Sequence, residues 1–381
     1  MLVKNAEVFI NGQFHNRDIR IDKGIISEVG AGLTGGDILG ASGMFVFPGF
    51  IETHIHGGAR DRLAGGGDAA KKIAAWLPQY GITGWIPTPT ATTIEDSLKA
   101  VRGIRAAKGS PGADILGISF YSPYKNRSIS YYPDKVPPTK EHTLAMMDGD
   151  ISDLLIVSVA PELPGGMEYI KWLKSENIIP MIAFTEATAK EIYEAADNGA
   201  TLLDHFFNGF PPMKHSEEGS TIGCLLEDRL YAQMQMDHVH VTEPFIRLAM
   251  RVKGADRIIA VHDGSEFVGA PDGEYFRGTD PDSPTYRLIK KDGAVRNKDG
   301  KLVTGCRSYD ENMRTAYSKG YALEDIGKMF SENAAKMLGL TDRGKIEAGR
   351  RGDLVVMNKE LFVQKTIILG DVVFSAGCKA T

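Results

Sequence analysis

Residues 48–58 read Pro48-Gly49-Phe50-Ile51-Glu52-Thr53-His54-Ile55-His56-Gly57-Gly58, an apolar run that ends in two histidines and two glycines. Side chains alternate between the faces of a strand, so His54 and His56 point the same way, roughly 7 Å apart along the chain. Two imidazoles at one strand end can share a metal ion, and the glycines let the backbone turn away. A His-x-His pair alone is more often two half-exposed strand histidines, so the rest of the chain must decide.

Length and composition bound the class of protein. The chain has 381 residues, of which 43% are hydrophobic, and a net charge of -5, so it can bury a sizeable core and has no basic footprint for nucleic acid or an anionic membrane. No apolar run is long enough to span a bilayer, and no secretory signal opens the chain. Cys224, Cys306 and Cys378 are odd in number and far apart, which indicates neither a disulfide framework nor a cysteine zinc site. We expect a cytoplasmic protein with a small-molecule substrate.

The two ends of the chain have the pattern of one small β-domain. Short apolar runs separated by turn pairs such as Asn11-Gly12 and Lys23-Gly24 fill residues 1–47, and similar runs follow residue 345. Neither set closes a core alone. We therefore expect a β-sandwich built from residues 1–47 and 345–381, with a larger domain over residues 48–344 inserted between them.

The middle of the chain alternates apolar runs of strand length with amphipathic helical stretches. This alternation argues for a parallel sheet covered by helices, and eight repeats favour an α/β fold of the closed (β/α)8 TIM-barrel type over an open doubly wound sheet. Residues 264–277 and 290–301, rich in Gly, Asp and Lys, are expected to be long loops over the barrel mouth. The predicted strands are Phe45–His54, Gly84–Thr88, Asp114–Tyr121, Leu154–Glu162, Ile178–Phe184, Thr201–His205, Leu230–His238 and Arg257–Asp263, and the predicted helices are Asp68–Tyr80, Thr93–Ala107, Gly165–Lys174, Thr188–Asp197 and Glu243–Val252.

Polar residues gather at the carboxyl ends of these predicted strands, where a barrel carries its active site. Neutral imidazoles and a carboxylate there would hold a divalent ion that activates water, and Asp263 is placed to take the proton of that water. Asp263-Gly264 also reads as an ordinary turn pair. The strand-end residues are His54, His56, Glu162, Glu186, His205, Asn208, Asp237, His238, His240, His262 and Asp263.

Several stretches together resemble the amidohydrolase superfamily and, within it, the N-acetylglucosamine-6-phosphate deacetylases. They are the opening segment 48–57, the strand-end Asp263, Val159-Ala160-Pro161-Glu162, His205-Phe206-Phe207-Asn208-Gly209-Phe210-Pro211, Asp237-His238-Val239-His240-Val241, residues 332–340 and residues 344–354. The resemblance implies a metal-dependent hydrolase of C–N bonds that uses zinc, iron or manganese and forms a homodimer. It also implies that Asp263 is the acid–base, His205 a metal ligand, His240 a contact of the acyl carbonyl or sugar, and Asn208 part of a phosphate site.

The chain departs from that family at four positions. Tyr121 stands where a metal-binding Glu is expected and Phe184 where a metal-binding His is expected; neither side chain replaces the ligand. Tyr131 stands for a substrate-binding His, and Ser216 for a phosphate-binding Arg, with Lys214 and His215 close by. The sequence therefore predicts one ion held by His54, His56 and Asp263, completed by His205, Glu162 or Glu186, and an altered substrate that contacts His240, Asn208, His238, Tyr121, Glu162 and Glu186.

Two further hypotheses stay open at this point. The chain is either a hydrolysis-deficient paralogue that binds a sugar phosphate or another metabolite, or a metal-independent enzyme that uses Asp263 with His238 or His240. Bound metal separates the hydrolase from both, because a fold does not determine a function.

Overall fold

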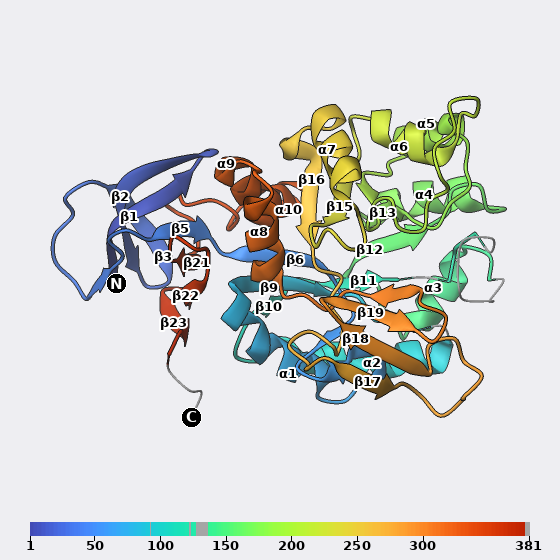
Figure 1. The fold of residues 1–381 in the computed structure, drawn as a ribbon, viewed down its shortest axis with the longest axis horizontal. Helices are drawn as coiled ribbons and strands as arrows, with labels where there is room; N and C mark the ends of the chain where they lie inside the picture. Colours follow the sequence, from blue (N-terminus) through green and yellow to red (C-terminus); the bar gives the residue numbers. More distant parts are fainter. Residues whose placement is uncertain (92, 122, 127–135, 378–381) are drawn as a thin grey trace.

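The computed structural model describes residues 1–91, 93–121, 123–126 and 136–377, which form a mixed α/β protein (Figure 1). The blue N-terminal strands and the red C-terminal strands lie side by side at one end, and the helices and parallel strands make up the larger part (Figure 1). In the described part of the chain, no helix combines the length and the hydropathy needed to cross a lipid bilayer. Tyr131 lies outside the described residues.

Both ends of the chain contribute to one sheet. β5 is the link, because it pairs in parallel with β1 and in antiparallel with β21. Apolar side chains from both ends, including Val8, Ile21 and Leu354, form a hydrophobic cluster of their own under this sheet. Its strands are β1 (Leu2–Ile10), β2 (Gln13–Asp22), β3 (Ile25–Gly30), β4 (Ile38–Gly40), β5 (Phe45–Pro48), β21 (Leu354–Met357), β22 (Val363–Ile368) and β23 (Asp371–Ser375).

Nine of the strands between these ends run parallel to their neighbours, as their buried apolar runs predict. They form a three-stranded sheet in the order β10-β9-β6 and a six-stranded sheet in the order β11-β12-β13-β14-β15-β16. An isolated parallel bridge between Ile55 and Gly264 joins the end of β6 to the segment after β16. The strands are β6 (Phe50–Ile55), β9 (Ile82–Pro87), β10 (Asp114–Ile115), β11 (Ile118–Phe120), β12 (Leu154–Val159), β13 (Ile179–Ile182), β14 (Leu202–Leu203), β15 (Tyr231–Gln235) and β16 (Ile258–Val261).

Two predicted strands are each divided in the structure. The run Phe45–His54 breaks at Gly49, where a Cβ atom would lie 2.1 Å from the Thr83 hydroxyl, so its first half pairs in the terminal sheet and its second half in the parallel one. The run Asp114–Tyr121 is divided between β10, which pairs with β9, and β11, which pairs with β12. Both halves of each run are largely apolar, so the sequence shows no change where one strand ends and the next begins.

Helices alternate with the parallel strands, and polar caps fix where several begin. Thr93 caps α2 by accepting from the Asp96 amide, and Thr188 with Glu191 forms a capping box on α5. The helices are α1 (Ala69–Trp76), α2 (Ile94–Ala107), α3 (Lys140–Met146), α4 (Gly166–Ser175), α5 (Ala189–Asp197), α6 (Ser220–Leu226), α7 (Glu243–Val252), α8 (Tyr309–Ser318), α9 (Leu323–Gly327) and α10 (Asn333–Met337), with short 3-10 turns at Leu63–Gly65, Leu77–Tyr80 and Ala255–Arg257 and a π-helical turn at Lys328–Glu332.

The segment expected to be two long loops instead contains an antiparallel sheet, so that expectation is wrong. Its central hairpin turns at Asp292 and Gly293, both with positive φ, which suits the twist of a two-residue hairpin. Leu288, Lys290 and Val295 are buried on one face, while Arg287 and Lys291 stay in solvent. The strands are β17 (Gly273–Phe276), β18 (Arg287–Lys291), β19 (Ala294–Asn297) and β20 (Leu302–Thr304); a smaller pair, β7 (Gly57–Gly58) and β8 (Asp61–Arg62), follows the histidine pair.

Candidate metal centre

Four successive parallel strands end in residues with an unusual backbone. Phe184, His205, His238 and Asp263 follow β13, β14, β15 and β16, and their φ angles are 44°, 20°, 57° and 47°. Positive φ is uncommon for residues other than glycine and costs of order 1–3 kcal/mol each, so it persists only where the surroundings impose it. Such strain at one edge of a parallel sheet marks this edge as a candidate site.

His54 and His56 meet above the end of β6 with fixed tautomers. The His56 Nδ1 lies 2.6 Å from the Thr88 carbonyl oxygen, which can only accept, so Nδ1 carries the proton. Gln233 donates its amide to the Thr53 carbonyl and hydroxyl, so its Oε1 faces the His54 Nδ1 at 3.0 Å and accepts from it. In the neutral form of both rings, the two Nε2 lone pairs therefore point at each other across 3.2 Å. Two lone pairs this close, with their outer nitrogens held by acceptors, are typical of a cation site.

Asp263 completes this cluster from the end of β16. Its Oδ1 lies 3.1 Å from the His56 Nε2 and 3.6 Å from the His54 Nε2, and it is buried without a hydrogen-bond donor among the described residues. Its Oδ2 accepts from Gln235, whose own oxygen accepts from Asn208. A buried carboxylate oxygen aimed at two imidazole lone pairs fits a divalent ion with two nitrogen ligands and one oxygen ligand. The residues present therefore fit the metal that the sequence predicts.

A second cluster of His54, Asp204 and His205 lies beside the first, with its ligand atoms within 4.8 Å of one another. The lone pair of neutral His54 lies on its Nε2, which faces His56 and Asp263. The protonated Nδ1 of His54 lies 3.0 Å from the Asp204 Oδ1. Asp204 and His205 are then left as possible ligands in this half. His205 as a further metal ligand stays a prediction; its Nδ1 faces the Asn208 carbonyl and its Nε2 lies 3.4 Å from the Tyr121 hydroxyl.

The buried carboxylates give the centre a negative potential. Burial alone lowers the pKa of His54, but Asp204 and Asp263 outweigh it and raise that pKa to about 9. Burial alone raises the pKa of Asp263, yet the imidazoles of His56, His54 and His205 hold it well below its usual range. The site therefore favours a cation, as a metal-binding site must.

The other predicted histidines occupy different surroundings. The His240 Nδ1 lies 2.6 Å from Asp237 Oδ2, which leaves its buried Nε2 without a hydrogen-bond partner among the described residues. Asp237 outweighs burial and raises the pKa of His240, to which Asp263 also contributes. His238 faces Glu243 at 2.8 Å, and His262 is hydrogen-bonded to the buried Glu52. His240 is linked to the metal cluster through the charge of Asp263, and His262 through Glu52, which also accepts from the His54 amide.

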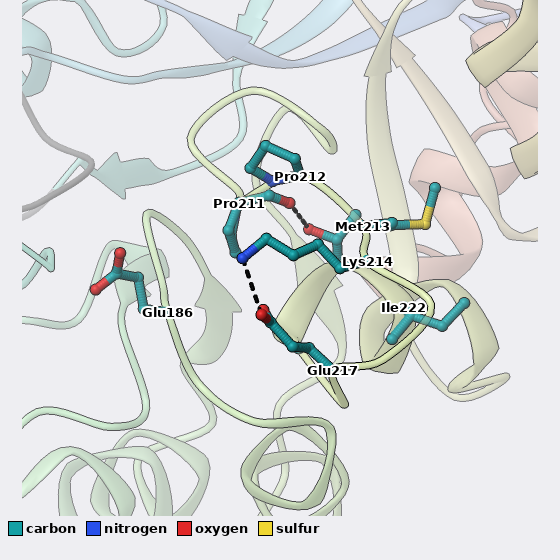
Figure 2. Close-up of a pocket in the computed structure, with 9 residues that line it drawn as sticks. Glu186, Pro211, Pro212, Met213, Lys214, Glu217 and Ile222 are labelled. Carbon is teal, nitrogen blue, oxygen red and sulfur yellow. Dashed lines mark hydrogen bonds and ion pairs between the residues drawn. The ribbon is translucent and has the colours of Figure 1, made fainter.

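Glu162 and Glu186 lie on the outer side of the site. Glu162 accepts from Asn126, from the Thr185 hydroxyl at 2.5 Å and from the Glu186 amide, so its carboxylate joins three segments. Glu186 itself is exposed and lines a cavity of about 380 Å³ with Lys214 and Glu217, which form an ion pair at 2.9 Å (Figure 2). In Figure 2 the Lys214 side chain extends toward Glu217 across this cavity, below Pro211 and Pro212 in this view.

Tyr121 and Phe184, which replace two expected ligands, form an aromatic wall next to the histidines. The Tyr121 ring lies 5.0 Å from that of His56 and 5.7 Å from that of His54, and Phe184 packs edge-on against Tyr121 and His205. The buried Lys125 places its Nζ 3.1 Å from the centre of the Tyr121 ring and 4.3 Å from that of Phe184. A cation over two aromatic faces is a favourable arrangement.

Sequence analysis missed several residues that the structure places here. Gln233 and Gln235 alternate along β15 with apolar neighbours, and this period-two polar pattern in a buried strand was a usable signal. Asp204 ends an apolar run immediately before His205. Lys125 carried no signal, because an isolated lysine in a connecting segment is usually solvated.

Comparison with known proteins gives a consistent picture. A profile of the Amidohydrolase family matches residues 277–373, a stretch that begins after Asp263. An N-acetylglucosamine-6-phosphate deacetylase of Lysinibacillus sphaericus is 28% identical over 380 residues, covering 97% of each chain. An N-acetylgalactosamine-6-phosphate deacetylase of Escherichia coli O157:H7 is 29% identical and covers 85% of this chain and 86% of its own.

Solved structures show the same likeness. The crystal structure of N-acetylglucosamine-6-phosphate deacetylase from Thermotoga maritima superposes with a TM-score of 0.87 at 26% identity, covering 99% of this chain and 100% of its own. A mutant of the Mycobacterium smegmatis deacetylase, solved in complex with N-acetyl-D-glucosamine-6-phosphate, superposes with a TM-score of 0.85 at 25% identity, covering 98% and 99%.

Proposed function

Because this chain resembles amidohydrolases, and N-acetylhexosamine-6-phosphate deacetylases in particular, along almost its whole length, we propose that it hydrolyses an acyl C–N bond with the help of a divalent metal. The observation that carries this proposal is the cluster of His54, His56 and Asp263. Its two Nε2 atoms face a carboxylate oxygen that accepts no hydrogen bond from the residues that the structure describes. This donor set suits zinc, with iron and manganese as alternatives.

The chain's own residues supply the proton chemistry. When bound, the metal would lower the pKa of water. Asp263 Oδ1 accepts one proton from the attacking water and passes it to the nitrogen as the C–N bond breaks and the new C–O bond forms. Gln235 holds the other oxygen of Asp263, so the accepting oxygen stays turned toward the histidines. The products are a carboxylate and an amine.

The proposed substrate is an N-acetylated hexosamine phosphate or a close analogue. The names of the similar enzymes support this class, and His240 offers an unpaired Nε2 to a substrate oxygen. The cavity beside Glu186 is a candidate for the distal part of the substrate, with Lys214 as its cation and Ser216 where the family has an arginine. Because Glu217 already pairs with Lys214, we expect a weaker phosphate contact than an unpaired arginine would make.

The finer organisation belongs to the same proposal. We propose that the parallel strands close into a (β/α)8 barrel over residues 48–344, with the Ile55–Gly264 bridge as the closing contact, and that residues 1–47 and 345–381 form the β-sandwich. We also propose a cytoplasmic homodimer, which follows from the resemblance and from the widely separated cysteines.

The test is elemental analysis of the purified protein and of a His54→Ala/His56→Ala variant, followed by turnover of N-acetylglucosamine 6-phosphate and N-acetylgalactosamine 6-phosphate. We expect about one equivalent of zinc, iron or manganese in the wild-type protein, its loss in the variant, and release of acetate by the wild type alone. A protein that holds no metal and takes up no added zinc contradicts the proposal and returns attention to a binding protein or a metal-independent enzyme.

A further inference from the structure

Lys125 is a buried lysine beside the candidate site. The residue is 6% exposed, and its Nζ lies over the faces of Tyr121 and Phe184; the Tyr121 ring in turn lies 5.0 Å from that of His56. Burying a lysine is costly and rarely happens without a compensating partner. A lysine held in this position therefore needs an explanation that surface solvation does not give.

Two buried carboxylates provide the compensation. Lys125 lies over Tyr121 and Phe184, whose rings contact those of His56 and His205, and the charges of Asp204 and Asp263 both favour its protonated form. Neither oxygen of Asp204 accepts a hydrogen bond from a described residue, although the carboxylate is fully buried. Asp204 therefore needs nearby positive charge, which His205, His54 and Lys125 can supply.

We infer that Lys125 contacts the substrate in this site, where its ammonium group, rather than a second metal ion, binds the acyl oxygen of the scissile bond. The inference rests on the proposed function, because it assigns to Lys125 the polarisation of the acyl carbonyl, opposite the cluster of His54, His56 and Asp263. The second cluster has too few ligands for a metal, because the free lone pair of His54 already serves the first one. Lys125 brings a positive charge to this same half of the site.

The chemistry of acyl transfer gives that charge a purpose. Negative charge develops on the acyl oxygen as water attacks, and a fixed donor in a dry site stabilises that charge strongly. Tyr121 and Phe184 exclude water from one side of Lys125 and restrict where its Nζ can move. The predicted contact is a hydrogen bond from Lys125 Nζ to the acyl oxygen, with no proton transferred.

The test compares the wild type with Lys125→Met, which keeps the chain length and removes the charge, and with the control Lys253→Met. Lys253 is also buried, but its Nζ donates to the Glu227 carbonyl outside the site. Acetate is titrated into the cobalt-loaded proteins and followed by cobalt absorbance, and metal content and kcat/KM for N-acetylglucosamine 6-phosphate are measured in parallel. A Lys125→Ala variant assayed with added ethylamine tests rescue of the missing amine.

We expect Lys125→Met to keep its metal equivalent, to bind acetate at least tenfold more weakly and to lose about 100-fold or more in kcat/KM, while Lys253→Met changes none of these. We also expect ethylamine to restore part of the activity of Lys125→Ala. Unchanged acetate binding in Lys125→Met, loss of its metal, or absence of rescue would overturn the inference. If the wild type hydrolyses neither sugar, the proposed function fails, while the acetate titration still tests the role of Lys125.

Discussion

Gln233 gives the sharpest test of how the metal site is organised. Its Oε1 accepts from the His54 Nδ1 at 3.0 Å, and its Nε2 donates to the Thr53 hydroxyl at 3.0 Å. This pair of contacts fixes the side-chain amide and, through it, keeps the proton of His54 on Nδ1. Gln233→Met has a similar volume and removes the acceptor, so it is expected to weaken metal binding without removing a ligand.

The expected size of this effect follows from the contacts. Leaving a buried N–H unpaired costs about 1–3 kcal/mol, and loss of a partner that orients a metal ligand usually costs about 10–100-fold in affinity. Asp204 remains 3.0 Å from the same nitrogen and can accept part of that hydrogen bond. We therefore expect the metal dissociation constant to rise about tenfold, toward the lower end of this range.

Competition with a chromophoric chelator measures the zinc affinity directly. The control is Thr366→Val, which removes a hydrogen bond from a fully buried hydroxyl to the Pro78 carbonyl, far from the site in the terminal sheet. Both variants should unfold somewhat more easily than the wild type, whereas Gln233→Met alone should bind zinc more weakly. Equal zinc affinity in Gln233→Met and the wild type would refute the assignment of the His54 tautomer.

Three other predictions concern neighbouring residues. Gln235→Met should lower kcat about tenfold or more with the metal content unchanged, because Asp263 loses the donor that orients it. Steady-state kinetics and elemental analysis of the same preparation check this, and an unchanged kcat would argue against Gln235 as the residue that orients Asp263. Gly209→Ala should destabilise the protein by about 1–3 kcal/mol in denaturant unfolding, because φ at Gly209 is +73° and a Cβ there would lie 2.7 Å from the Phe184 ring. The control Gly300→Ala, with φ +77° and open space around it, should lower the free energy of unfolding by less. In the metal-free protein, burial outweighs the carboxylates and lowers the pKa of Lys125 from 10.5 to about 7. The folded state then binds fewer protons than the unfolded state between those pH values, so the stability of the wild type relative to Lys125→Met should rise with pH across that window. A pH-independent difference in thermal unfolding would contradict the placement of Lys125.

The pattern of hydrophobic residues predicted much of the fold, since parallel strands buried on both faces and amphipathic helices have distinct periods. It could not show where a buried run changes sheets, as at Gly49, because both halves of that run are equally apolar. The Asp292-Gly293 pair shows a different failure. That pair is a strong hairpin signal, and it was outweighed by the polar composition around it.

The candidate site was predictable where it rests on a local motif. His54 and His56 lie on one strand face and carry their own signal, whereas Asp204 and Lys125 acquire a role only through residues distant in sequence. The positive φ angles of His205 and Asp263 have no counterpart in composition, because strain is imposed by surrounding packing. The sequence also showed that Phe184 cannot bind a metal and that Tyr121 is a poor substitute for a carboxylate ligand, but not that they cover a buried lysine.

The charges of the site explain why these substitutions are compatible with hydrolysis. Asp204 and Asp263 together balance one divalent ion, so the Lys125 ammonium group leaves a single surplus positive charge. An oxyanion that develops on the substrate would neutralise this surplus and would favour the protonated form of Lys125 at the moment when its charge is needed. A second divalent ion would add positive charge beside Lys125, and only Asp204 and His205 of the second cluster would be left as ligands for that ion. A centre with one metal ion and one buried lysine is therefore the electrostatically consistent reading of Tyr121, Phe184 and Lys125 together.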